Sequence, residues 1–316
     1  MSARKDLTCV GLTILDILGK PIEEIPKGGK TTIIQQIRIT PAGTAAGPAV
    51  IAAKLGLSTA LVGARGNDDM GSILEEMLKK QRVDTSFMQV RSDMPTSATM
   101  LAVNANCERP NFHAIGASVF LEIDEARRKC ITGSRFVHWG GAGTMLNLDG
   151  GIGAEILKEA KSMGAVVTCD FIAPMPETLP ALQRVMPQVD YFLPSLEEAM
   201  EVTGTKSAED AGRAFLDMGA GCCIFKSGSK GSLLIDRGRK LRVPAYKVEA
   251  YDTTGCGDAY CAGFIAALSH GWEIEKSCRF ASAVAALVAT GLGSDAGVTD
   301  FAAAERAMES LPVMDA

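Results

Sequence analysis

Residues 252–264 read DTTGCGDAYCAGF, a run of small residues followed by an apolar helical pattern that begins at Asp258. The first turn of a helix carries backbone N–H groups without partners and the positive end of the helix dipole. Because glycine has no side chain, Gly255 and Gly257 let an anion come close to these N–H groups. The residue pattern therefore predicts an anion hole formed by Gly255, Cys256 and Gly257.

Asp258 stands beside this predicted anion hole. A carboxylate there can accept the proton of a hydroxyl group, and an anion hole next to a carboxylate base is what phosphoryl transfer to an alcohol requires. The pattern alone leaves a second interpretation open, in which Asp258 only caps the helix, since aspartate is common at helix starts.

Cys256 lies at the same helix start and also has two interpretations. The helix dipole and free N–H groups favour a thiolate, which predicts a thiol that is sensitive to alkylation or oxidation. In the other interpretation Cys256 only supplies a small residue, with its backbone N–H facing the anion.

Upstream of this segment, short β-branched runs alternate with helical patterns. This order predicts right-handed βαβ units and a mostly parallel sheet with helices on both faces. The predicted strands are residues 8–14, 59–63, 136–139, 166–171, 191–193, 222–225 and 233–236. The predicted helices are residues 47–55, 70–80, 153–163, 196–202 and 208–218, with two more between residues 258 and 290, separated near Gly271.

Two segments depart from this order, residues 31–40 (TTIIQQIRIT) and 96–105 (TSATMLAVNA). Each reads as a strand with one polar face, and each has a neighbouring strand candidate, at residues 14–18 and 111–115. The four segments form either a small separate sheet or an antiparallel extension of the main one. His113, in the last of them, either faces a substrate or is a half-exposed strand residue.

Composition excludes several classes of protein. Apolar residues make up 47% of the 316-residue chain, too many for a disordered protein, and the length suits one large α/β domain or two units. Lys plus Arg is 32 and Asp plus Glu is 37, so the net charge of −5 gives no overall attraction for nucleic acid or an anionic membrane. Nine cysteines without a CxxC pair argue against a disulfide framework or a zinc site. With no signal-peptide layout and no run of about 20 apolar residues, we expect a cytoplasmic protein.

The motif DTTGCGD resembles the DTxGxGD signature of the ribokinase-like (PfkB) carbohydrate kinases, and the similarity runs from residues 9–16 (CVGLTILD) to the final helices. It implies an α/β ribokinase-like fold, in which a mostly parallel central sheet is flanked by helices and carries a small β-sheet lid. The implied core comprises residues 1–12, 41–95 and 118–316, and the implied lid residues 13–40 and 96–117. The resemblance also implies that Asp258 is the catalytic base.

For the acceptor substrate, the resemblance implies a role for Asp16, which matches the acidic residue that binds sugar hydroxyls after the first strand. Residues 41–50 (PAGTAAGPAV) stand where the family has a GGxxxN motif. Gly43 keeps the close backbone approach, whereas Gly47 replaces the asparagine. The alternative for this segment is a plain turn before a helix.

For the nucleotide and its metal, residues 192–198 (FLPSLEE) resemble the NxxE region, with Ser195 in place of asparagine. The resemblance implies that Glu198 organises the water shell of Mg²⁺. Residues 225–232 (FKSGSKGS) resemble the nucleotide segment. The ATP-binding residues implied there are Lys226, Ser227, Gly228 and Gly231, together with Gly257.

The resemblance further implies a monovalent cation site, and K⁺ is its expected occupant. Its side-chain part matches Asp252 and Thr254, and its carbonyl ligands would come from Val288, Gly291 and Gly293. The alternative is that Asp252 only holds the turn.

Taken together, the resemblance predicts an enzyme that uses ATP and Mg²⁺ to phosphorylate a hydroxyl of a small sugar or sugar derivative. It also implies a homodimer that forms through an apolar face of the lid. Three alternatives remain: a nucleoside kinase of the same fold, a catalytically weak sugar-sensing protein suggested by Gly47 and Ser195, and an oxidoreductase. The last lacks a dinucleotide fingerprint after the first strand.

Overall fold

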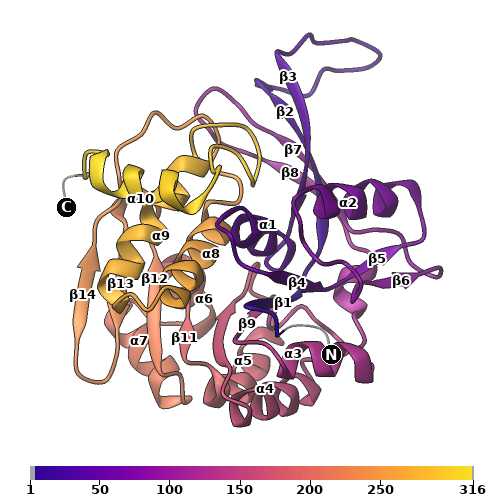
Figure 1. The fold of residues 1–316 in the computed structure, drawn as a ribbon. Coiled ribbons are helices and arrows are strands. Elements are labelled where there is room, and N and C mark those ends of the chain that lie inside the picture. The colour runs from indigo at the N-terminus through magenta and orange to yellow at the C-terminus, as the bar shows by residue number, and fades with distance from the viewer. Residues whose placement is uncertain (1–3, 315–316) are drawn as a thin grey trace.

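The computed structural model describes residues 4–314, and its largest feature is a central eight-stranded sheet (Figure 1). In spatial order its strands are β14 (Lys240–Val243), β13 (Ser232–Ile235), β12 (Cys222–Lys226), β11 (Tyr191–Phe192), β10 (Val166–Asp170), β9 (Phe136–Gly140), β1 (Leu7–Gly11) and β4 (Thr59–Val62). The strands from β4 to β12 are parallel, and β13 and β14 continue the sheet antiparallel. The predicted mostly parallel sheet is confirmed.

Helices cover both faces of this sheet, as its nearly continuous apolar strands require. Along β1, Leu7 and Cys9 belong to one apolar cluster and Val10 to another, because successive side chains point to opposite faces. The face that includes Val10 packs against α3 (Glu125–Thr132), α4 (Ile152–Ser162), α5 (Thr178–Val185), α6 (Leu196–Thr203) and α7 (Ala208–Asp217). The other packs against α1 (Ala46–Lys54), α2 (Asp69–Lys80), α8 (Cys256–Ser269), α9 (Ile274–Val288) and α10 (Phe301–Ser310).

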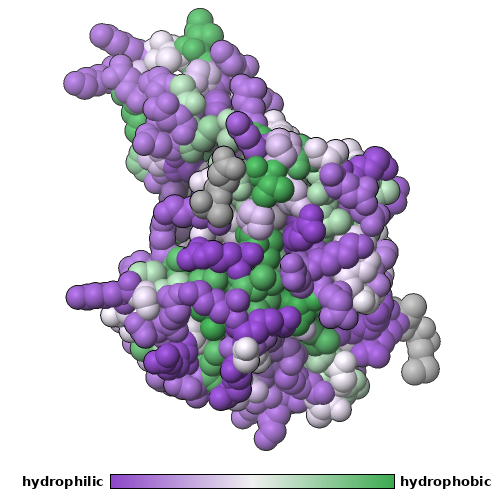
Figure 2. Space-filling view, turned by 90° about the vertical axis from the view of Figure 1, so that its left-hand side faces the viewer, coloured by the Kyte–Doolittle hydropathy of each residue, from purple (hydrophilic) through white to green (hydrophobic). Residues whose placement is uncertain are grey.

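A second, four-stranded sheet projects from the body of the molecule and is called the small sheet below (Figures 1 and 2). Its order is β3 (Gln36–Ala42), β2 (Ile14–Lys20), β7 (Ala98–Ala102) and β8 (Asn111–Ala114). Because none of these strands pairs with the central sheet, the antiparallel extension is excluded. A further pair, β5 (Ala64–Gly66) and β6 (Gln89–Arg91), forms a sheet of its own.

The register of the small sheet places one polar row across all four strands. Asp16 lies opposite Thr40 on one side and Thr99 on the other, and Thr99 lies opposite His113. Asp16, Thr40 and Thr99 are buried. The row is therefore turned away from solvent from Thr40 to Thr99, whereas His113 at its edge is exposed.

The adjacent row is apolar and lies on the opposite face, because side chains alternate along each strand. It runs from Ile39 through Ile17 and Met100 to Phe112. Met100 and Phe112 are each 59% exposed. The small sheet thus presents its apolar side to solvent, which reverses the usual arrangement of a half-buried sheet.

Several predicted boundaries were wrong. The predicted strand 8–14 is two strands, because the chain leaves the central sheet after Gly11 and enters the small sheet at Ile14. The predicted strand 31–40 begins only at Gln36, since its partner β2 ends at Lys20, opposite Gln36. Helix α8 begins at Cys256 rather than at residue 258. The elements that the patterns did not predict are β5, β6, β14, α3, α5 and α10.

Candidate active site

The turn before α8 has the geometry of an anion-binding helix start. Gly255 occupies the N-cap position with a φ of 75°, and a Cβ built there would lie 2.5 Å from Cα of Ser294. Only glycine fits this position without strain. The N–H groups of the following turn, including that of Gly257, have no partner inside the helix.

Asp258 lies in this first turn and is half-buried. Within residues 4–314 its carboxylate accepts no hydrogen bond, and Gly255 holds the cap position, so the interpretation of Asp258 as a helix cap is wrong. Burial raises the pKa of Asp258 to about 8, helped by the negative charge of Asp170. Burial and the neighbouring carboxylates thus favour the protonated form of Asp258.

Lys226 ends β12 and lies next to the same turn. Its Nζ forms an ion pair of 2.6 Å with Oδ2 of Asp170, at the end of β10, and lies 3.3 Å from the place of a Cβ on Gly257. Burial opposes the charge of Lys226, but the Asp170 carboxylate outweighs it and raises the lysine pKa. A permanent positive charge therefore stands beside the helix start.

Glu198 and Ser195 form a reciprocal cap at the start of α6. The Ser195 hydroxyl accepts from the Glu198 N–H at 3.2 Å and donates to the Glu198 carboxylate. The charge of Glu198 contributes to the raised pKa of both Asp170 and Asp258. Lys226 thus lies near the carboxyl groups of Asp170 and Asp258, and Glu198 is close enough to raise the pKa of both.

Gly43 and Gly47 bring the loop after β3 against the site. Gly43 has a φ of 95°, and a Cβ on it would lie 2.6 Å from the carbonyl oxygen of Leu12. Gly47, in the first turn of α1, faces the carboxylate of Asp258, and a Cβ there would lie 2.7 Å from Oδ2. Any side chain at position 47 therefore requires Asp258 to move.

Asp16 lies in the polar row of the small sheet and is 6% exposed. Burial raises its pKa to about 7, whereas a hydrogen bond from Thr99 opposes the rise. The Thr99 hydroxyl also lies 3.0 Å from Nδ1 of His113. His113 therefore belongs to a hydrogen-bonded row that ends at Asp16, although its own ring is exposed.

Asp252 joins the turn before α8 to the loop after α9. Its Oδ1 accepts from the Thr254 N–H at 2.9 Å and from the Thr254 hydroxyl at 2.7 Å, and its Oδ2 accepts from the Gly293 N–H at 2.8 Å. Val288 and Gly291 lie at the end of α9 and in the following loop, where the Gly291 N–H donates to the Val288 carbonyl. The residues predicted for a monovalent cation are therefore neighbours.

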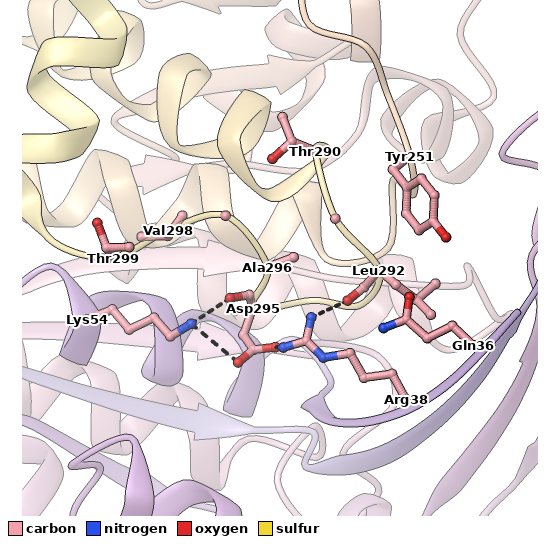
Figure 3. A pocket seen from close by; sticks show the side chains of 12 residues that line it. Gln36, Arg38, Lys54, Tyr251, Thr290, Leu292, Asp295, Ala296, Val298 and Thr299 are labelled. Atoms are coloured by element: carbon pink, nitrogen blue, oxygen red, sulfur yellow. Dashed lines mark hydrogen bonds and ion pairs between the residues drawn. The ribbon is translucent and has the colours of Figure 1, made fainter.

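A cavity of about 520 Å³ lies beside this 290–299 loop (Figure 3). Arg38 of β3 donates to the Leu292 carbonyl and pairs with Asp295 at 2.7 Å, while Lys54 of α1 bonds the Asp295 carbonyl at 2.5 Å. These bonds connect β3 of the small sheet to the 290–299 loop, whose Gly293 N–H donates to Asp252.

The predicted nucleotide segment forms the turn between β12 and β13. Ser227 and Gly228 begin this turn, and the Ser227 N–H donates to the Gly231 carbonyl at 2.8 Å. The turn follows Lys226 directly, so the predicted nucleotide residues adjoin the helix start that carries Asp258.

Cys256 does not have the low pKa that its place at a helix start favoured. Burial raises the pKa of its thiol to about 12, and its side chain packs against the apolar cluster under α8. Desolvation disfavours the thiolate here, which supports the interpretation of Cys256 as a small residue at the helix start.

The patterns missed Asp170 and Thr99 as members of the site. A signal for Asp170 was present, since it ends a predicted parallel strand and sites gather at the carboxyl ends of such strands. For Thr99 the signal is the cross-strand register, which only the structure supplies.

The profile of the pfkB family carbohydrate kinases matches residues 4–300. The chain belongs to this family. It is 27% identical to a nucleoside kinase of Methanothermobacter thermautotrophicus, with 95% of this chain and 94% of that protein covered, and 25% identical to the ribokinase of Haemophilus influenzae, with 93% and 95% covered.

Solved structures show the same fold. A putative ribokinase from Agrobacterium tumefaciens matches with a TM-score of 0.85 at 21% identity, over 97% of this chain and 98% of that one. Arabidopsis thaliana ribokinase, solved with ribose and ATP, matches with a TM-score of 0.80 at 24% identity, over 97% and 99%.

Family membership establishes a phosphotransferase with an alcohol group as acceptor, and kinases of this family use ATP and Mg²⁺. The oxidoreductase alternative is thereby excluded. Between residues 4 and 314, no helix has the length and apolar character needed to cross a membrane.

Proposed function

We propose that this protein is an ATP-dependent kinase that phosphorylates a hydroxyl of a small sugar or sugar derivative, with Asp258 as general base. The observation that carries the proposal is the state of Asp258, a half-buried carboxylate with no hydrogen-bond partner in the described chain and a pKa of about 8. A carboxylate in a purely structural role would be paired.

In the proposed reaction, Asp258 takes the proton of the acceptor hydroxyl as its oxygen attacks the γ-phosphorus of ATP. The bond between that phosphorus and the oxygen of ADP breaks, and N–H groups of residues 255–257 stabilise the charge on the phosphoryl oxygens. Asp16 positions the acceptor by accepting hydrogen bonds from its hydroxyl groups.

Lys226 and Glu198 support the nucleotide. The ammonium group of Lys226 lies beside Gly257, where it can contact a phosphate oxygen without leaving Asp170. Glu198 and Asp170 would hold Mg²⁺ through water, and the ion would neutralise charge on the phosphates. Ser227, Gly228 and the turn that follows would border the nucleotide.

A nucleoside is the second candidate acceptor. The nucleoside kinase of M. thermautotrophicus is 27% identical over nearly the full chain, and a nucleoside offers the same ribose hydroxyls to Asp16. Gly47, where a family asparagine is replaced, removes one acceptor contact and supports a departure from free ribose or fructose.

The test is an ADP-release assay with Mg²⁺ over matched panels of free sugars, sugar acids and nucleosides. We expect turnover with at least one sugar-like acceptor and a product phosphorylated on that acceptor, identified by mass spectrometry. Turnover confined to nucleosides would favour the second candidate. ADP release equal with and without every acceptor would contradict the proposal.

We also propose that K⁺ binds between the turn before α8 and the loop after α9. The Asp252 carboxylate already accepts three hydrogen bonds, so the ion would be held mainly by the carbonyl groups of Val288, Gly291 and Gly293. Turnover in KCl should exceed turnover in choline chloride at equal ionic strength, and equal rates would contradict this site.

Finally, we propose that residues 13–40 and 96–117 act as a lid over the acceptor and pair with a second copy of the chain. The exposed row of Ile39, Met100 and Phe112 supports this, because a contiguous apolar face on a small sheet is stabilised when a partner covers it.

A further inference from the structure

Pro48 interrupts the backbone hydrogen bonds at the start of α1. The N–H groups on either side of it, those of Gly47 and Ala49, each donate to the carbonyl four residues earlier, at 2.9 and 3.1 Å. In the same pattern residue 48 would donate to the Thr44 carbonyl, but proline has no N–H. Thr44 is 4% exposed, and within residues 4–314 no backbone N–H donates to its carbonyl. A buried carbonyl needs a partner, so another donor is required here.

His138 of β9 supplies this donor. Its side chain is fully buried, and its Nε2 lies 3.0 Å from the Thr44 carbonyl oxygen. Because a carbonyl only accepts, Nε2 carries the proton of this bond. Nδ1 lies 2.9 Å from Oγ1 of Thr168, which stands opposite His138 on β10. The Thr168 hydroxyl donates to Nδ1 and so selects the tautomer in which His138 donates to the loop before α1.

The imidazole of His138 is neutral in this position. Burial lowers its pKa to about 3, the charge of Lys226 adds to this effect, and the hydrogen bond with Thr44 opposes it. At neutral pH the ring therefore exchanges no proton with a substrate. What His138 contributes is the position of the groups that it bonds.

The bonded carbonyl lies close in the chain to the residue that faces the proposed base. Thr44 precedes the first turn of α1, and a Cβ on Gly47 in that turn would lie 2.7 Å from Oδ2 of Asp258. The end of β9 also packs directly on the loop, because a Cβ on Gly140 would clash with the Thr44 carbonyl oxygen. The central sheet thus determines where Gly47 lies, and with it the space for the Asp258 carboxylate.

We propose that His138 is a positioning residue for phosphoryl transfer, which makes the hydrogen bond that Pro48 cannot make and so holds the first turn of α1 against Asp258. The inference rests on the proposed kinase function. Without this bond the Thr44 carbonyl turns towards another donor, since a buried unpaired carbonyl is costly. Gly47 then shifts, and Asp258 is no longer fixed relative to the acceptor hydroxyl. A displacement of about 1 Å at a reacting group can cost about 100-fold in rate.

The test compares kcat/KM for the acceptor with the MgATP affinity measured by titration calorimetry. His138→Leu fills the site with an apolar side chain that has no donor. We expect its kcat/KM to fall about 10- to 100-fold and its MgATP affinity to stay within about threefold of the wild type. His138→Gln keeps an amide N–H within reach of the Thr44 carbonyl, so its kcat/KM should fall less than about fivefold.

Pro48→Ala, added to His138→Leu, tests the origin of the effect. Alanine provides the N–H that residue 48 lacks, and this group can donate to the Thr44 carbonyl in place of the histidine. We expect the double variant to recover kcat/KM to within about fivefold of the wild type. Pro48→Ala alone should have the kinetics of the wild type.

Thr8→Val is the matched control for the loss of a buried hydrogen bond. Thr8 is fully buried near the amino end of β1, at the edge of the sheet opposite the site, and its hydroxyl lies 2.7 Å from that of Ser134. This variant should unfold at a lower urea concentration than the wild type, with kcat/KM unchanged. A general loss of stability is thereby separated from a loss of position.

Hydrogen exchange followed by mass spectrometry gives a readout that does not depend on turnover. The N–H groups of Gly47 and Ala49 should exchange faster in His138→Leu and slow down again when Pro48→Ala is added. In Thr8→Val they should exchange as in the wild type. Unchanged exchange in His138→Leu overturns the proposal, whereas a wild type without turnover contradicts the kinase function itself.

Three kinetic outcomes also overturn the role of His138. The first is a wild-type kcat/KM in His138→Leu. The second is an equal loss of MgATP affinity, which indicates a general structural role. The third is a loss of kcat/KM that is as large in His138→Gln and that Pro48→Ala does not reduce, because the missing donor is then not its cause.

Discussion

At the scale of single residues, the site contains two carboxyl groups whose pKa is raised by burial. Asp258 and Asp16 have pKa values of about 8 and about 7, in both cases chiefly because of burial. Asp170 adds its negative charge near Asp258, and the ammonium of Lys226 only partly offsets it. Such raised values are typical of groups that exchange protons in catalysis.

These values predict the pH dependence of turnover. A general base must be ionised before it accepts a proton, so a raised pKa removes activity on the acid side. We expect kcat/KM for the acceptor to rise from about pH 6 through pH 8 and to level off only near pH 9, because this ratio reports the free enzyme and its base is half ionised at about pH 8. A profile that is flat from about pH 5.5 to 9 would argue against both carboxyl groups.

At the scale of elements, the conformation of the loop between β3 and α1 depends on Gly43. Gly43→Ala would force a side chain into a φ of 95° and to within 2.6 Å of the Leu12 carbonyl oxygen. We expect a loss of about 1–3 kcal/mol in the free energy of unfolding, measured with urea.

Gly29→Ala is the control for this substitution, since a Cβ there meets no atom within 4 Å and the residue is exposed. Its stability should stay within about 0.5 kcal/mol of the wild type. Equal stability of the two variants would mean that the contact between the loop and Leu12 is not tight.

The elements also show what the sequence could and could not predict. Alternating strands and helices were enough for the parallel sheet, because βαβ units permit few other arrangements. The strand predicted at 31–40 was misplaced because its limits depend on where its partner β2 ends, which is a long-range property. For α3, only Ile131 and Thr132 of the eight residues are buried, so the sequence has no apolar face that marks the helix.

Some residues of the site could likewise be predicted from the sequence, and others could not. Asp258 and residues 255–257 lie in one local motif, so their position at a helix start could be predicted from the residues alone. Asp170 and Thr99 come from other strands, and only the fold brings them there. Cys256 was ambiguous because the dipole and burial shift its pKa in opposite directions, and the depth of burial is not visible in the sequence.

At the scale of the whole molecule, the exposed apolar row of the small sheet predicts a dimer. In size-exclusion chromatography with light scattering, we expect the wild type to have twice the mass of one chain. Phe112→Glu should shift it towards the monomer, because a buried unpaired charge at an interface costs several kcal/mol. Gln35→Glu, an exposed change just before β3, should remain dimeric. A monomeric wild type at micromolar concentration would contradict pairing through this face.

The most direct test of the account as a whole is the turnover of Asp258→Asn with the best acceptor from the panel. The change removes the base but keeps the size of the side chain beside Gly47. We predict that kcat falls about 10²- to 10⁴-fold, while calorimetry shows MgATP affinity within about threefold of the wild type. A purified, folded Asp258→Asn protein that turns over at nearly the wild-type rate would contradict the assignment of Asp258 as the base, and with it the central claim about this site.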